Sequence, residues 1–265
     1  MSEKITGAEA MLRAIEAEGV DTIFGYPGGA IIPVFDRLYD HDSKLKHILV
    51  RHEQGATHAA QGYARVSGKT GVVIVTSGPG ATNAITGISD AMMDSTPMVV
   101  IMGQVASESL GSDAFQETDV IGITQPVTKW SHQIRTADEI AWAVSRAFYI
   151  ASTGRPGPVV LDFAKNAQNG LVEWNDDYQK CKFIRSYIPY PTVDEEDVDT
   201  VAEIINAAEL AYHTKEHLWR VLTQEFPNVH KQLLKLSFDC TDRENRSIHK
   251  ALKEMLTLTQ EEYPQ

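Results

Sequence analysis

The chain has 265 residues, of which 43% are hydrophobic and 23% charged, and its formal net charge is -12. This composition is typical of a globular protein with one large domain or two smaller ones, and the negative charge argues against nucleic acid or anionic membranes as main partners. No apolar run reaches the ~18 residues of a membrane span, and the start of the sequence lacks a signal-peptide pattern, so we predict a cytoplasmic protein.

The first two-thirds of the sequence alternate between short apolar runs and helical patterns. The capping box Thr6–Glu9 opens the first expected helix, which ends near Gly19. The apolar runs do not alternate with polar residues, as expected for strands buried on both faces of a parallel sheet. The expected strands are Thr22–Phe24, His47–Val50, Gly71–Thr76, Met98–Met102, Val127–Trp130 and Pro158–Phe163, and the expected helices between them are Ala30–Tyr39, Glu53–Val66, Ala81–Met93 and Glu139–Ala151.

These elements predict an α/β fold, a doubly wound parallel sheet of about six strands, over residues 1–170. Residues 171–192 have no regular pattern and are interpreted as a linker. A second capping box, Thr192–Glu195, opens residues 193–265, which show helical stripes and no strand pattern. We therefore expect a helical C-terminal tail of unknown role.

Three turns follow predicted strands, at the end of the strands where open α/β sheets bind ligands. They are Gly25–Ala30, Arg51–Ala56 and Ser77–Asn83. Glycines let a backbone approach a ligand closely, and prolines stiffen a turn. One glycine-proline turn would be an ordinary connection, but two in matching positions of one sheet favour a binding site. Glu53 falls in the first turn of a helix, where a carboxylate also suits the helix dipole.

Spacing excludes several sharper motifs. His52 and His58 are too far apart for the zinc-protease motif, Gly68-Lys69-Thr70 misses the phosphate-loop spacing, and Gly78-Pro79-Gly80 does not continue as a dinucleotide fingerprint. The two cysteines, Cys181 and Cys240, match no metal or redox spacing. No metal-binding residues are predicted.

Six segments together resemble the motif set of the acetolactate synthase large subunit, in its order and spacing. The resemblance extends from about Ile5 to about Ala208. The segments are Gly25–Ala30, Arg51–Ala56, Gly62–Arg65, Thr76–Asn83, Asp113–Glu117 and Ser152–Val159.

The resemblance implies a transferase that uses thiamine diphosphate to decarboxylate pyruvate and join the product to a second 2-oxo acid, pyruvate or 2-oxobutanoate, in branched-chain amino-acid biosynthesis. It implies that residues 1–170 are the domain that binds the cofactor's pyrimidine ring. Glu53 then hydrogen-bonds N1′ of that ring and promotes removal of the proton from C2 of the thiazolium, while the cofactor is the electron sink. Gln116 is the second catalytic residue and faces the reacting carbon.

The other implied roles follow by motif match. Phe115 and Lys129 correspond to positions near the substrate channel, and Arg155 to a position near a bound flavin. The implied cofactor-binding residues are Pro27, Gly28, Gly29, Glu53, Thr76, Pro79, Gly80, Asn83 and Arg155.

The sequence departs from the family after about Ala208 and contains no Gly-Asp-Gly, the motif that holds the diphosphate through Mg²⁺ in the family's second thiamine domain. The family's FAD-binding middle domain is also not recognisable. We therefore expect a component that is inactive alone and works as a homodimer or with a chain that carries the diphosphate domain; a regulatory small subunit is a further candidate partner.

Two alternatives stay open at this point. The chain could be a non-catalytic oligomerisation or interaction module built on a truncated pyrimidine domain. Within the enzyme class, glyoxylate carboligase and pyruvate oxidase are rivals, but the glyoxylate enzyme lacks a glutamate at the position of Glu53.

Overall fold

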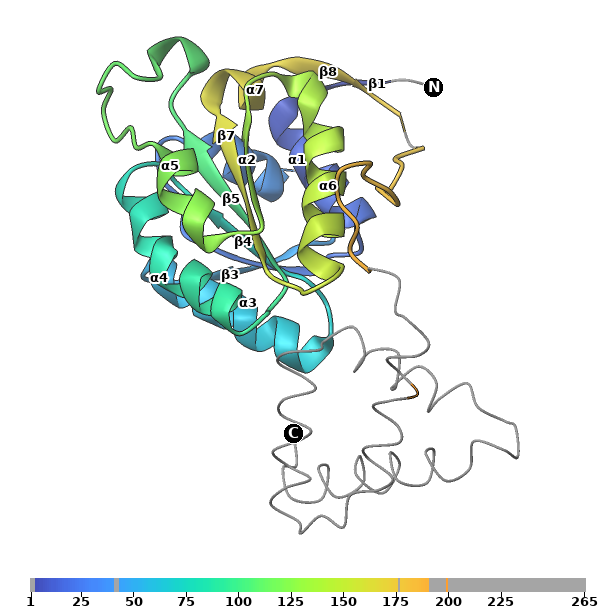
Figure 1. The fold of residues 1–265 in the computed structure, drawn as a ribbon. Helices are drawn as coiled ribbons and strands as arrows, with labels where there is room; N and C mark the ends of the chain where they lie inside the picture. The colour runs from blue at the N-terminus through green and yellow to red at the C-terminus, as the bar shows by residue number, and fades with distance from the viewer. Residues whose placement is uncertain (1–2, 41–42, 176, 191–198, 200–265) are drawn as a thin grey trace. The chain divides into compact units, whose positions relative to one another are not determined.

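The structure is a computed structural model that describes residues 3–40, 43–175, 177–190 and 199. The chain divides into two units, 1–187 and 188–265, and nearly all described residues belong to the first. That unit is built on a six-stranded parallel sheet with helices on both faces (Figure 1). The strands are β2 (Thr22–Gly25), β3 (Lys46–Leu49), β4 (Gly71–Val75), β5 (Met98–Gln104), β6 (Trp130–Ile134) and β7 (Pro158–Ala164), in the order β3-β2-β4-β5-β7-β6.

Alternate residues of the central strands face opposite layers. On β4, Val72 and Ile74 join one core cluster, while Val73 and Val75 join the other. Every residue of β4, β5 and β7 is buried, which confirms a parallel sheet covered on both faces. The first cluster includes helices α1 (Gly7–Ala17), α2 (Ile32–Asp40) and α6 (Ile140–Ser152), and the second includes α3 (Glu53–Ser67), α4 (Pro79–Met93) and α5 (Val120–Thr124).

The capping box at the start of the chain is confirmed. Thr6 is the N-cap of α1, and its hydroxyl oxygen accepts a hydrogen bond from the Glu9 backbone N–H at 3.3 Å. Gly19 follows the end of this helix with a positive φ of 91°, which glycine adopts without steric cost.

The expected strand Val127–Trp130 is wrong. Residues Gln125–Val127 form a 3₁₀ turn, and the strand at this place is β6, which begins only at Trp130. The physical reason is that β6 lies at an edge of the sheet. Its Ser131, His132 and Gln133 are only partly buried, so the strand lacks the apolar pattern of the central strands.

Several short elements had no sequence prediction. Strands β1 (Glu3–Thr6) and β8 (Leu171–Trp174) pair antiparallel in a separate two-stranded sheet, with Glu3 opposite Trp174. Because β8 lies within residues 171–192, this part of the expected linker is ordered as a strand. Helix α7 (Lys165–Asn169) follows β7. The predicted helical tail, 193–265, falls outside the described residues except for position 199.

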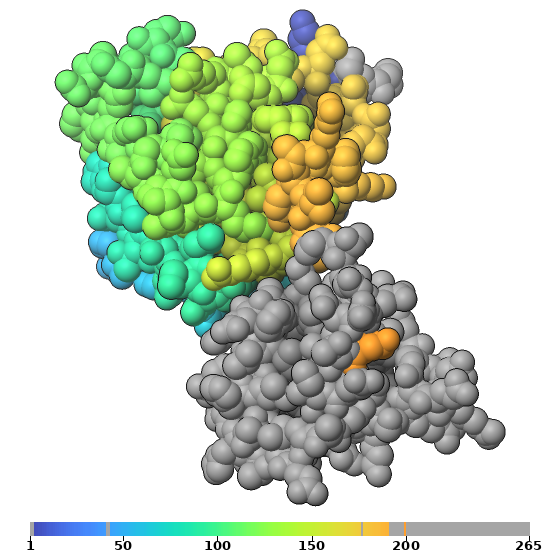
Figure 2. Space-filling model, in the orientation of Figure 1, coloured from blue at the N-terminus to red at the C-terminus, as the bar shows by residue number. Residues whose placement is uncertain are grey.

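Residues 177–187, which belong to the first unit, pack against α1 and α6; Figure 2 shows this segment in orange beside the yellow-green helix α6. The Tyr178 hydroxyl donates to a Glu18 carboxylate oxygen at 2.8 Å, and the Ser145 hydroxyl donates to the Gln179 carbonyl at 3.2 Å. Burial raises the pKa of both Glu18 and Tyr178. In the part of the chain that the structure describes, no helix has the length and apolar character needed to cross a membrane.

Candidate functional site

The turns after β2, β3 and β4 meet at the carboxyl ends of the strands, because neighbouring parallel strands end on the same side of the sheet. We call this end of the sheet the Glu53 edge. A Cβ atom on Gly28 would lie 2.6 Å from the Thr76 Cβ, and one on Gly80 would lie 2.7 Å from the Thr76 Cγ2. The same Cβ on Gly80 would be 3.4 Å from Glu53 Oε1. Gly28, Glu53 and Gly80 therefore lie close together, with Thr76 between the two glycines.

Glu53 is the first residue of α3, and its side chain is buried although its residue type is usually exposed. Its position follows from the N-cap His52, whose Nδ1 accepts a hydrogen bond from the Gln54 N–H at 3.2 Å. Glu53 Oε2 accepts a hydrogen bond from Asn83 Nδ2 at 3.0 Å. No described residue donates to Oε1, the oxygen nearest to Gly80. The carboxylate is thus held by Oε2, and Oε1 has no hydrogen-bond donor among the described residues.

The glycine turn after β2 packs against Thr76. The Ala30 N–H donates to Thr76 Oγ1 at 3.2 Å, and the Ile31 N–H donates to the Gly28 carbonyl at 2.9 Å. Pro27 and Gly29 are exposed, and nothing lies within 4 Å of a Cβ built on Gly29. The predicted pocket residues Pro27, Gly28 and Gly29 therefore form a rim of accessible backbone beside Thr76.

The close packing of Gly80 against Thr76 gives a compensation test. We expect Gly80→Ala to lower the free energy of unfolding by about 1–3 kcal/mol, because the added methyl overlaps Thr76 Cγ2. Thr76→Ser removes that methyl but keeps the hydroxyl that binds the Ala30 N–H. The double variant should therefore regain most of the lost stability in chemical denaturation. If the stability losses of the two single variants simply add in the double variant, the methyl group added at position 80 and Thr76 Cγ2 do not compete for the same space.

The loop after β5 brings Gln116 to the same edge. A Cβ on Gly78, whose φ is +55°, would lie 2.6 Å from the Gln116 carbonyl oxygen. Gln116 itself has a φ of +57°, a strained conformation for a residue with a side chain, and such strain is concentrated at functional sites. Phe115 beside it is exposed. Glu117 closes the loop by accepting hydrogen bonds from the Gly111 and Ala114 N–H groups, which lower its pKa.

Two predicted residues lie at the amino ends of the strands, at the other end of the sheet from Glu53. Arg155 precedes β7, and its guanidinium donates to the Met92 carbonyl at 3.0 Å, at the C-terminal end of α4. Lys129 precedes β6, and its ammonium donates to the Thr153 carbonyl at 2.7 Å. Asn83 and Met92 are nine helical residues apart, about 14 Å. This chain does not bring Arg155 or Lys129 to Glu53, and their flavin and substrate-channel roles stay predictions.

Two residues that sequence reasoning missed lie at the Glu53 edge, on helix α7. Lys165 Nζ donates to the Gly29 carbonyl at 3.4 Å, and Gln168 Nε2 donates to the Ala30 carbonyl at 2.7 Å. The helix has only five residues, too few for a periodic pattern. The available signal was its position directly after a predicted strand, at the same edge as the three turns.

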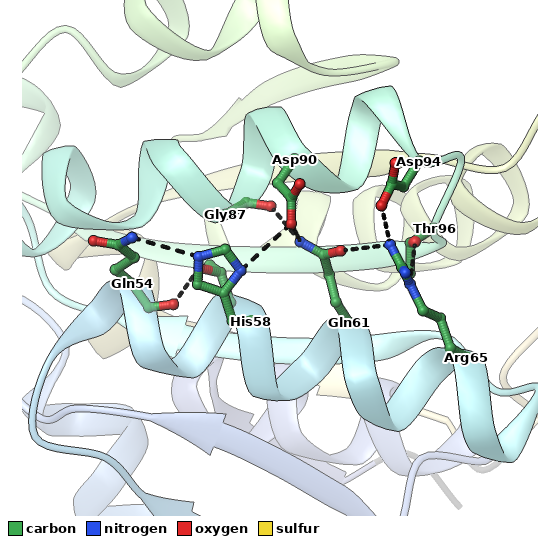
Figure 3. A network of polar contacts seen from close by, with 9 residues as sticks. Gln54, His58, Gln61, Arg65, Gly87, Asp90, Asp94 and Thr96 are labelled. Carbon is green, nitrogen blue, oxygen red and sulfur yellow. Dashed lines mark hydrogen bonds and ion pairs between the residues drawn. The ribbon is translucent and has the colours of Figure 1, made fainter.

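A polar seam joins α3 and α4 along their length (Figure 3). The buried Gln61 donates from Nε2 to the Gly87 carbonyl and to Asp90 Oδ2, both at 2.9 Å, and Arg65 pairs with Asp94. A Cβ on Gly87 would overlap Thr57 Oγ1, so the two helices touch closely. The seam therefore fixes the relative position of α3, which begins with Glu53, and α4, which carries Asn83 in its second turn.

A cavity of about 610 Å³ lies elsewhere, between α1, α6 and residues 172–183. Its lining includes Trp142, Arg146, Trp174 and Tyr178, and none of the predicted site residues. We place the functional site at the Glu53 edge instead, because the buried carboxylate, the two close glycine contacts and the strained loop converge there.

The N-terminal part of the chain is similar to known proteins. Residues 5–123 match the family described as "Thiamine pyrophosphate enzyme, N-terminal TPP binding domain", where TPP is thiamine diphosphate. The chain is 52% identical over 187 residues to the acetolactate synthase large subunit of Haemophilus influenzae, covering 71% of this chain and 32% of that protein. It is 54% identical to the acetolactate synthase large subunit of Corynebacterium glutamicum, over 65% of this chain and 27% of that protein. It is also 54% identical to the probable acetolactate synthase large subunit of Methanocaldococcus jannaschii, over 63% of this chain and 28% of that protein.

The chain thus spans about a third of the length of these curated relatives. The family match includes the turns after β2, β3 and β4 and the loop that carries Gln116. Residues 5–123 of this chain therefore match the N-terminal TPP-binding domain of thiamine pyrophosphate enzymes, and the N-terminal part of the chain is similar to acetolactate synthase large subunits.

Proposed function

We propose that this chain supplies the pyrimidine-binding half of a thiamine-diphosphate-dependent acetolactate synthase. The reaction would decarboxylate pyruvate and join the remaining two carbons to pyruvate or 2-oxobutanoate. The observation that carries the proposal is the Glu53 carboxylate, buried at the start of α3, with Asn83 on Oε2 and Oε1 open toward Gly80.

The residues around Glu53 fit a flat ring with a basic nitrogen. Gly28 and Gly80 pack closely against Thr76 with no room for a side chain at either position, and the rim formed by Pro27 and Gly29 is accessible backbone that a ring could approach. When bound, thiamine diphosphate supplies the electron sink for decarboxylation. Glu53 would share a proton with the ring atom N1′, a task that suits a carboxyl group in a site with little water.

Asn83 and the loop after β5 have supporting tasks in this proposal. Asn83 holds Glu53 Oε2 at 3.0 Å, which would leave Oε1 for the ring. Gln116 would present its amide to the reacting carbon, and the exposed Phe115 would exclude water once a partner covers the loop. Pro79 begins α4 and directs its first turn, with Gly80, toward the same ring.

The remainder of the cofactor site would come from another domain. Most of the binding energy of a diphosphate comes from its charge, through Mg²⁺ and backbone N–H groups, and the net charge of -12 opposes an anion. We propose that a second copy or another chain provides the diphosphate and Mg²⁺ site, that FAD belongs to the assembled enzyme, and that a regulatory small subunit joins it. The cytoplasm is the proposed compartment.

A complementation assay tests this proposal. The helper is a full-length acetolactate synthase large subunit in which the glutamate equivalent to Glu53 has been changed to glutamine. With thiamine diphosphate, Mg²⁺, FAD and pyruvate, neither chain alone should form acetolactate, whereas the mixture should. The reason is that Glu53 then completes a site whose diphosphate half belongs to the helper.

Two outcomes would count against the proposal. Association with the helper without any acetolactate would favour a non-catalytic interaction module. Robust turnover by the isolated chain would show that it needs no other domain.

A further inference from the structure

Helix α7 holds the glycine turn from the side opposite to Glu53's helix, although the two segments are far apart in sequence. Gln168 is completely buried, and its Nε2 donates to the Ala30 carbonyl at 2.7 Å and to the Phe163 carbonyl at 2.8 Å. The first bond crosses from α7 to the turn after β2, and the second returns to the end of β7. Gln168 therefore ties the turn to a central strand of the sheet.

The chemistry of this amide shows which part of it matters. Both N–H donors of Gln168 are used, while Oε1 is buried and accepts no hydrogen bond from the described residues. A buried polar atom without a partner costs free energy, and most buried side-chain polar atoms have one. The unpaired Oε1 therefore destabilises the folded protein, and Gln168 contributes to the structure through the two hydrogen bonds that its Nε2 donates.

The peptide that Gln168 holds is fixed from several directions. The Ala30 N–H donates to Thr76 Oγ1, and the Ala30 carbonyl accepts from Gln168. Behind this carbonyl lies β5: a Cβ on Gly103 would be 2.7 Å from the Ala30 oxygen, so only glycine leaves room there. These contacts hold Ala30, and with it the end of the Gly28–Gly29 backbone, beside Thr76.

We propose that Gln168 is a positioning residue for the cofactor turn: through the Ala30 carbonyl it sets where the Gly28–Gly29 backbone lies against the pyrimidine ring. Gln168 does not touch the ring itself. The inference rests on the proposed function for the identity of the ligand, but the fixing of the turn by Gln168 can be tested without any ligand.

The first measurement is hydrogen exchange of the Ala30 and Ile31 amides in the full chain. Gln168→Met removes both donors at similar volume, and exchange of these two amides should become about tenfold faster, because a buried carbonyl loses its donor. Gln168→Glu keeps the shape and, when protonated, one donor. A buried carboxyl facing two carbonyls has a raised pKa, which the ammonium of Lys165 on the same helix partly offsets.

The pH dependence separates positioning from general packing. The ratio of exchange rates, Gln168→Glu to wild type, cancels intrinsic exchange at each pH. It should be about tenfold at pH 8, where the carboxylate repels both carbonyls, and below about threefold at pH 5, where the carboxyl donates again. Gln168→Met should show the same ratio at both pH values, since methionine does not titrate.

Thr124→Val is the matched control. It removes a buried hydroxyl that donates to the Val120 carbonyl on α5, an element that makes no described hydrogen bond to the turn. It should lower global stability and leave Ala30 and Ile31 exchange unchanged relative to the other amides. An increase in Gln168→Met that is spread evenly over the sheet, or a Gln168→Glu ratio that does not change with pH, would overturn the inference.

The second measurement adds thiamine diphosphate, Mg²⁺ and the helper chain. The half-saturating thiamine diphosphate concentration should rise roughly fivefold in Gln168→Met, with a smaller change in turnover at saturation, because the variant moves the binding surface and not the proton partner. If wild type does not complement the helper, the proposed function fails while the exchange result stands. If wild type complements and Gln168→Met has unchanged exchange and half-saturation, the inference fails alone.

Discussion

Glu53→Gln should reduce acetolactate formation in the mixed assembly by a factor of about a hundred or more, the usual size of a general acid–base contribution. Glutamine keeps the size of the side chain and can still accept from Asn83 Nδ2, so the local structure should persist. It cannot share a proton with a ring nitrogen, which is the task proposed for the carboxylate. The measurement is the turnover rate at saturating pyruvate, together with the affinity for thiamine diphosphate.

Glu173→Gln on strand β8 makes the same chemical change at an exposed position and is the control. It should leave turnover unchanged. If Glu53→Gln retained more than about a tenth of wild-type turnover, a proton-sharing role would be untenable, since even a modest general acid–base contribution exceeds tenfold.

Replacing Asp162 with asparagine should change how stability depends on pH. Asp162 lies on β7 and is completely buried; Oδ2 accepts from Gln133 at 2.6 Å and from Gln104 at 3.4 Å, while Oδ1 has no hydrogen-bond partner among the described residues. Burial is the main cause that raises the pKa of this carboxyl to about 6, against the lowering effect of the two amides; Asp119 raises it further and Arg135 lowers it.

A raised pKa in the folded state means that folding favours the protonated form. The stabilisation by this group is complete below the unfolded-state pKa of 3.8 and is lost as the pH rises through about 6. The difference between the folded and unfolded pKa values corresponds to about 3 kcal/mol of stability. The free energy of unfolding of wild type minus that of Asp162→Asn should therefore fall by about 2–3 kcal/mol between pH 4 and pH 7.5.

Urea denaturation at a series of pH values measures this difference, and the carboxylates common to both proteins cancel in it. Asp36→Asn, a change at an exposed carboxylate on α2, should give a difference that is constant over the same range. Parallel stability curves for wild type and Asp162→Asn would show that Asp162 does not bind its proton more tightly in the folded protein.

The core of the site was predictable because parallel strands end on the same side of a sheet. Glycine turns after two apolar strands and Glu53 after a third had to meet once those strands became neighbours. Sequence alone could not show that Thr76 separates Gly28 from Gly80, or that Asn83 holds Glu53, because those contacts depend on side-chain directions across three turns.

Other features could not be predicted for different reasons. The edge strand β6 has one neighbour and polar residues, so it lacks the apolar signal of the central strands. Gln168 acts through two backbone carbonyls, and no residue pattern marks such a contact in advance. Arg155 and Lys129 were assigned by motif position only, whereas sheet topology places them at the amino ends of β7 and β6.

The pairing of β1 with β8 has a consequence for the order in which the domain is completed. Glu3 lies opposite Trp174, so this small sheet joins segments separated by nearly the whole domain. During synthesis, the first strand leaves the ribosome long before its partner exists, and closing a loop of roughly 170 residues is entropically costly until the central sheet has brought the ends together. Strand β1 therefore stays without its partner until β8 has been made, and we expect the β1–β8 pair to form after the central sheet.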